Sequence, residues 1–72
     1  MNELDERINL LEETVSSLKK ELRRIKSAIN KVEKIGLVPP SEILFKKEDI
    51  ECILKDRKQE LKALKKVSKL LD

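Results

Sequence analysis

The segment LDERINLLEETVSSLKKELRRIKSAINKV, residues 4–32, carries apolar residues at alternating steps of four and three. On a helix, this heptad spacing places the apolar residues on one narrow line. Such a line predicts a long helix that packs along its length against another helix. The line, which we call the seam of this helix, consists of Leu4, Ile8, Leu11, Val15, Leu18, Leu22, Ile25, Ile29 and Val32.

The only Gly/Pro cluster of the chain follows this segment and predicts where the chain reverses. We expect the first helix over about 3–35, because it contains no glycine or proline. Gly36 can end that helix in a left-handed conformation, and the two prolines that follow prevent its continuation. A turn is expected over 36–46 and a second helix over about 47–71. The sequence leaves open whether 41–46 is a helical turn or an ordered loop.

The second helix has a wider and less regular apolar face than the first. Arg57 and Ser68 occupy positions that a seam normally gives to apolar residues. We therefore predict an all-α fold, an antiparallel two-helix coiled-coil hairpin that forms a single domain over 1–72. The width of the second face also allows dimerisation into a four-helix bundle. The stripe of this helix is Ile50, Ile53, Leu54, Leu61, Leu64, Val67 and Leu71.

The charges favour the antiparallel direction. Each predicted helix begins with an excess of acidic residues and ends with an excess of basic ones, which also suits the helix dipoles. A hairpin sets the acidic start of one helix beside the basic end of the other. Residues whose numbers sum to about 77–79 should then face each other. The expected pairs are Glu12 with Lys66, Glu13 with Lys65, Lys26 with Glu51, and Lys31 with Glu48.

The composition argues against catalysis and against metal or cofactor binding. The chain has no histidine, and a single cysteine excludes an internal disulfide and a metal site of the usual His/Cys kind. Cys52 is expected on an outward face, beside Glu51, which disfavours a thiolate. Some chorismate mutases are small and all-helical, and their active sites need several inward Arg and Lys side chains. Here the heptads place a single basic residue, Arg57, at a core position, which argues against this class of enzyme. We therefore expect no enzyme, no cofactor and no small-molecule substrate.

The location that the composition favours is the cytoplasm. No apolar run reaches the roughly 20 residues of a membrane span, and the acidic N-terminal residues do not resemble a signal peptide. Lysine and glutamate are abundant while glutamine, methionine and cysteine are scarce, as in many thermophile proteins.

Two groups of residues are candidate interaction sites. A basic patch midway along the hairpin could contact nucleic acid weakly or bind an acidic protein surface. Apolar residues outside the seams suggest a protein interface, used by a partner or by a second copy of the chain. The patch consists of Lys19, Lys20, Arg23, Arg24, Lys55, Arg57 and Lys58, and the predicted protein interface consists of Leu10, Ile53, Val67 and Leu70.

In helix count, size and turn, the predicted hairpin resembles Rop-type RNA-binding hairpins, which dimerise into four-helix bundles. It is also similar to the small basic helical subunits of replication and transcription enzymes, including archaeal DNA polymerases. Our leading hypothesis is a non-enzymatic accessory or assembly subunit of a larger complex, such as DNA- or RNA-processing machinery. The alternative is a homodimeric, Rop-like nucleic-acid-binding protein that uses the central basic patch.

Overall fold

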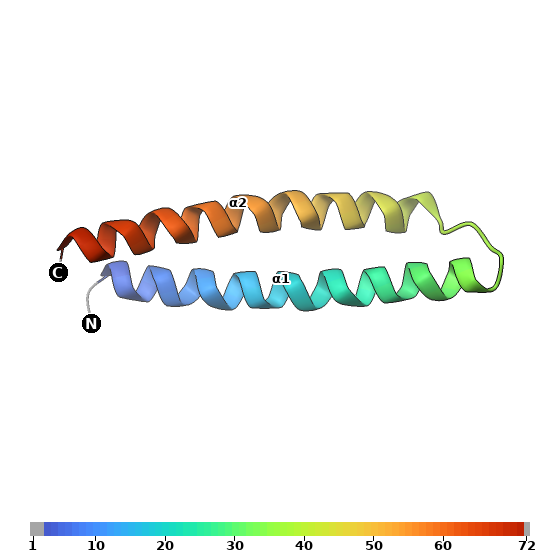
Figure 1. Ribbon diagram of the computed structural model, residues 1–72, viewed down its shortest axis with the longest axis horizontal. Coiled ribbons are helices and arrows are strands. Elements are labelled where there is room, and N and C mark those ends of the chain that lie inside the picture. The colour runs from blue at the N-terminus through green and yellow to red at the C-terminus, as the bar shows by residue number, and fades with distance from the viewer. Residues whose placement is uncertain (1–2, 72) are drawn as a thin grey trace.

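The computed structural model describes residues 3–71, which form two long helices joined by a short connection (Figure 1). Helix α1 spans Glu3–Lys34 and helix α2 spans Ser41–Leu71. The helices lie side by side in opposite directions, so the start of α1 and the end of α2 share one end of a rod 55 Å long. The predicted all-α antiparallel hairpin is therefore confirmed.

Gly36 ends α1 because it adopts a left-handed backbone conformation with a φ of 82°. The Gly36 amide donates to the Glu33 carbonyl at 3.0 Å, and the Leu37 amide donates to the Val32 carbonyl at 3.2 Å. These bonds satisfy two carbonyls that the last turn of a helix leaves without partners. The space around Gly36 is open, so only the backbone conformation disfavours a larger residue there.

Helix α2 begins earlier than predicted, because residues 41–46 are helical and do not belong to a turn over 36–46. The Pro40 carbonyl accepts hydrogen bonds from the amides of Ile43 and Leu44, at 3.1 and 3.3 Å, and so forms the first turn. Proline is compatible with a helix start, since the amide hydrogen that it lacks has no helical partner there. The question that the sequence left open is settled in favour of a helix.

The predicted seam of α1 faces α2 along its whole length, and each of its residues is buried or half-buried. The inward line of α2 follows the same alternation of four and three from Ile43 to Ser68, with Arg57 as its exposed member. The two helices thus share a single strip of apolar contact. Among residues 3–71, the buried ones are Ile8, Val15 and Ile29 on α1 and Ile50 and Leu54 on α2.

Two ion pairs between the helices define their register. Glu12 Oε1 lies 3.4 Å from Lys65 Nζ, and Glu21 Oε1 lies 3.7 Å from Lys46 Nζ. In an antiparallel coiled coil, pairs of this kind join flanking positions on the two opposite sides of the seam. Both pairs fit a single register. It sets Ile8 opposite Leu64, Leu18 opposite Leu54, and Leu22 opposite Ile50.

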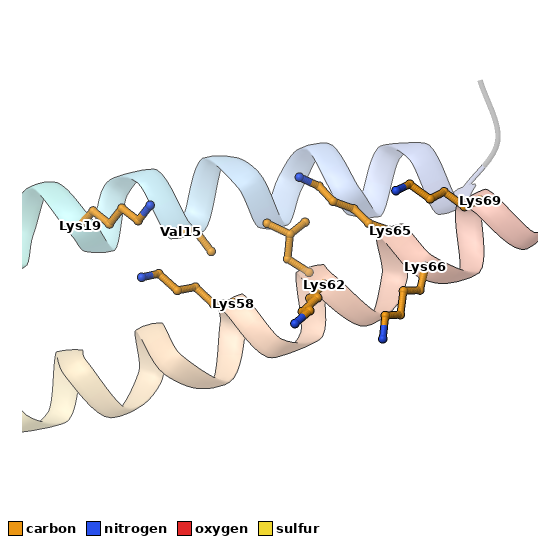
Figure 2. Close-up of a pocket in the computed structure, with 8 residues that line it drawn as sticks. Val15, Lys19, Lys58, Lys62, Lys65, Lys66 and Lys69 are labelled. Carbon is orange, nitrogen blue, oxygen red and sulfur yellow. The ribbon is translucent and has the colours of Figure 1, made fainter.

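Figure 2 agrees with this register, since Lys69 lies beside the start of α1 and Lys58 lies beside Val15. Each helix therefore extends past the start of the other, as Figure 1 shows. Leu71 belongs to the predicted stripe of α2 but is 73% exposed, because this end of α2 has little of α1 beside it.

The predicted charge pairing across the hairpin is only partly present. Glu12 pairs with Lys65, one residue away from its predicted partner. In the part of the chain that the structure describes, the pairs predicted for Glu48 and Glu51 do not form. Glu51 instead lies 3.7 Å from Lys47 on its own helix, because residues four positions apart on a helix are direct neighbours.

Two basic residues lie on the inward line of α2, where the sequence analysis counted only one. Arg57 directs its guanidinium outward, and its Nη1 lies 3.1 Å from Oε2 of Glu60. Lys47 is half-buried and reaches outward to Glu51. In both cases the aliphatic stem can pack along the seam while the charge stays near water.

Candidate interaction surfaces

The seam has two sides, and the heptad position of each residue determines which side it flanks. Lys19 of α1 and Lys58 of α2 flank the side that carries the pair between Glu12 and Lys65. Ile53 and Val67 flank the opposite side, which also carries the pair between Glu21 and Lys46. One side of the hairpin is therefore mainly basic, and the other exposes apolar residues.

On the basic side, an open groove with a volume of about 460 Å³ runs along the hairpin (Figure 2). Val15 and Leu61 form its apolar part, and lysines from both helices form the rest. A second, smaller hollow shares Lys19 and Lys58 with it and continues it toward the connection. We call the two together the lysine groove. Its basic residues are Lys19, Arg23, Lys26, Lys58, Lys62, Lys65, Lys66 and Lys69.

The charges in the lysine groove are mostly uncompensated. Lys65 pairs with Glu12, and the other basic residues of the groove have no ion pair within the described part of the chain. Lys19 and Lys58 lie across the groove from each other, where like charges repel. An anion with several charges would relieve this repulsion and is the ligand that the groove favours.

The structure brings part of the predicted basic patch into this groove. Lys19, Arg23 and Lys58 line it, and Lys55 lies on the same side of α2, three residues before Lys58.

The other residues of the predicted patch lie elsewhere. Lys20 is exposed on the outer face of α1, and Arg24 is exposed on the apolar side of the seam. Arg57 lies on the seam itself and pairs with Glu60. The predicted patch is therefore divided among three faces of the molecule.

The C-terminal half of the groove was not predicted from the sequence, because the lysines there were expected to pair with acidic residues of α1. A signal was nevertheless present. Lys58, Lys62, Lys65 and Lys69 follow steps of four, three and four, which place them on one side of a helix.

The predicted protein interface lies on the other side of the seam. We call its residues Leu10, Ile53, Val67 and Leu70 the apolar flank; they are between 44% and 85% exposed. Thr14 lies beside them and is half-buried, and its hydroxyl donates a hydrogen bond of 3.0 Å to the Leu10 carbonyl. Because Thr14 uses its polar group within its own helix, its methyl group can add to the apolar surface.

A second apolar surface, which the sequence analysis did not identify as a site, lies at the closed end of the hairpin. We call it the apolar tip, and it consists of Ile35, Leu37, Val38 and Phe45, each more than 60% exposed. Phe45, the one aromatic residue of the sequence, lies on the outer face of α2, away from the seam.

The structure also locates the groups that were considered for chemistry. Cys52 is a free, exposed thiol on α2. Among residues 3–71, no group of three or more His, Cys, Asp or Glu side chains is placed to hold a metal ion. Neither described helix is long and apolar enough to cross a membrane.

No protein-family model, no curated protein and no solved structure matches this chain.

Proposed function

We propose that this chain is a non-enzymatic interaction protein that serves as a small accessory or assembly subunit of a larger complex. One observation carries the proposal. Among residues 3–71, ten large apolar side chains are exposed, whereas five apolar side chains are buried. Exposed apolar residues that gather on a surface are typical of protein interfaces.

The size of the hairpin supports the same proposal. A chain of 72 residues has little stability to spare without staples, metals or partners. Covering the apolar flank or the apolar tip would bury apolar surface at roughly 25 cal/mol per Å². The lysine groove on the opposite side favours a complex that handles DNA or RNA, because it would remain free to attract phosphates.

The proposal can be tested by affinity purification from the native cell, followed by quantitative mass spectrometry. We expect Leu10→Lys to release the partners that the wild-type chain retains, because it places a charge in the apolar flank. Ser27→Lys is the matched control, since it adds the same charge to the exposed outer face of α1. Equal retention by all three chains, or the absence of any partner of the wild type, would reject the proposal.

A second candidate function is that of a homodimeric, Rop-like nucleic-acid-binding protein. It is favoured by the lysine groove, whose eight basic residues come from both helices. If phosphates bind there, the affinity for DNA or RNA should fall steeply with salt, since each neutralised phosphate releases counterions.

This candidate is tested by fluorescence anisotropy with labelled DNA and RNA from 50 to 300 mM salt. We expect Lys58→Glu combined with Lys62→Glu to abolish binding, whereas Lys20→Glu on the outer face should change it little. Binding that does not depend on salt, or no binding at low salt, would exclude this function.

A further inference from the structure

The apolar flank lies among charged residues whose signs follow a regular arrangement. On this side of the hairpin, between the middle of the rod and the connection, the outermost positions of α1 carry cations and those of α2 carry anions. All of these side chains are exposed, and none has an ion pair within residues 3–71. They are Arg24 and Lys31 on α1, and Glu42, Asp49 and Asp56 on α2.

The register sets these charges at matching heights along the rod. By this register, Arg24 lies level with Asp49, and Lys31 lies level with Glu42. Within one hairpin they remain apart, because they lie on the outer edges of the face. A partner with the reverse arrangement could pair with them. It would need anions over α1 and cations over α2.

A second copy of the chain has this reverse arrangement when it is turned about a twofold axis parallel to the helices. The rotation places α2 of the second copy over α1 of the first, antiparallel to it and at the same heights. Arg24 then meets the partner's Asp49, and Lys31 meets the partner's Glu42. Both contacts occur twice, as an isologous interface requires.

The other twofold arrangement, with its axis perpendicular to the helices, is disfavoured. It sets each helix over its own copy, so the cations of α1 lie over α1 and the acids of α2 lie over α2. When the two rods overlap along their full length, Asp56 of one hairpin lies close to Asp56 of the other, because Asp56 is at the middle of α2. Like charges that face each other across an interface oppose binding.

We propose that the apolar flank binds the apolar flank of a second copy of the chain. The two hairpins of this dimer are related by a twofold axis parallel to their helices. The result is a four-helix bundle with both connections at the same end. The inference rests on the proposed interaction function and names the partner of that surface.

The residues between the charges suit such close packing. Leu10 lies level with Ala63, so the rotation sets this leucine against a small residue of the partner's α2. Thr14 and Ala28 of α1 are likewise small and flank the seam on this side, and Glu21 between them is paired with Lys46 of its own hairpin. A helix of the second copy can therefore approach closely at Thr14 and at Ala28.

The area of this face is sufficient for a stable dimer. The rod measures 55 Å by 16 Å in this projection. Such a face offers on the order of 800 Å² per partner, the area of a standard specific interface. The dimer would bury both apolar flanks and leave the two lysine grooves on its opposite outer faces.

Charge reversal tests the arrangement directly. The quantity to measure is the dissociation constant of the dimer, obtained by sedimentation equilibrium of the full chain. We expect Arg24→Glu and Asp49→Lys each to weaken the dimer about tenfold or more, since each creates two repulsive contacts. The double variant should return to within about threefold of the wild type, because the pair is restored with reversed signs. Arg23→Glu is the control, since it makes the same change on the groove side.

A monomeric wild-type chain at 1 mM would overturn the proposal, and so would a double variant as weak as the single ones. The second result would point to the arrangement of like helices over each other. Circular dichroism of each variant separates loss of the dimer from loss of the helices. If the chain is monomeric but Leu10→Lys still releases a cellular partner, the proposed interaction function holds and only the second copy is excluded.

Discussion

The two sides of the seam are built from the same two helices, yet they offer opposite chemistry. The lysine groove carries basic residues over an aliphatic floor, and Glu12 beside it compensates only Lys65. The apolar flank carries exposed aliphatic residues between two lines of opposite charge. Each side also carries one ion pair between the helices, Glu12 with Lys65 beside the groove and Glu21 with Lys46 on the other side.

This difference shows how a two-helix hairpin can present two binding surfaces. Each helix uses one narrow line for the internal contact, so the residues beside that line remain available on both sides. Their chemistry can differ between the two sides, since lysines line the groove on one side while Ile53 and Val67 are exposed on the other. The hairpin therefore presents a basic surface on one side and an apolar surface on the other.

The largest effect is expected from Leu54, which is buried in the seam and also lines the lysine groove. Leu54→Ala should lower the free energy of unfolding by about 2–4 kcal/mol, because it removes a buried side chain and leaves a cavity. Urea unfolding followed by circular dichroism measures this loss. Cys52→Ala, on an exposed position of the same helix, should change it little. Equal losses would show that the seam does not hold the hairpin.

A smaller gain is expected where a basic residue interrupts the seam. Arg57→Leu should raise the free energy of unfolding by about 1 kcal/mol, since leucine can bury apolar area opposite Val15. The same urea titration measures the gain. Lys55→Leu is the control, because Lys55 faces away from the seam. No difference between the two variants would contradict the alignment of Arg57 with Val15.

The smallest effect concerns the repulsion across the lysine groove. Lys58→Glu should stabilise the hairpin by about 0.3–1 kcal/mol at low salt, because it sets a carboxylate opposite Lys19. The gain should disappear in roughly 1 M salt, where exposed charges are screened. Lys20→Glu makes the same change on the outer face, where the new carboxylate meets only Arg23 and Arg24 of its own helix, so the gain beyond this control measures the repulsion across the groove. A gain that persists in high salt would mean that charge is not its cause.

The fold could be predicted because it depends on strong local patterns. The heptads from Leu4 to Val32 predict a long helix that packs along one edge. Gly36 and the two prolines after it mark the one place where the chain is expected to reverse. The early start of α2 was missed because residues 41–46 carry no pattern that separates a helical turn from a loop. Their conformation depends on the bonds to the Pro40 carbonyl.

The surfaces were less predictable than the fold, because they depend on the register. A heptad pattern defines which line of a helix faces its partner, but a shift of seven residues leaves every apolar residue inward. The heptad positions place Lys26 and Arg24 on opposite sides of the seam, but only the ion pairs show which residues of α2 lie level with them. The apolar tip was missed for a related reason, since it lies where the helices no longer face each other.

The placement of both helix termini at one end has a mechanical consequence (Figure 1). A pulling force applied through the start of α1 and the end of α2 acts across the rod and not along it. The contacts of the seam would then break one after another from that end, beginning at Leu4. The force that resists opening at any moment comes only from the contact that is about to break. A force applied between that end and the apolar tip would instead load the helices along their axes. The hairpin should therefore extend gradually when it is pulled from its termini, and resist most when it is pulled from its tip.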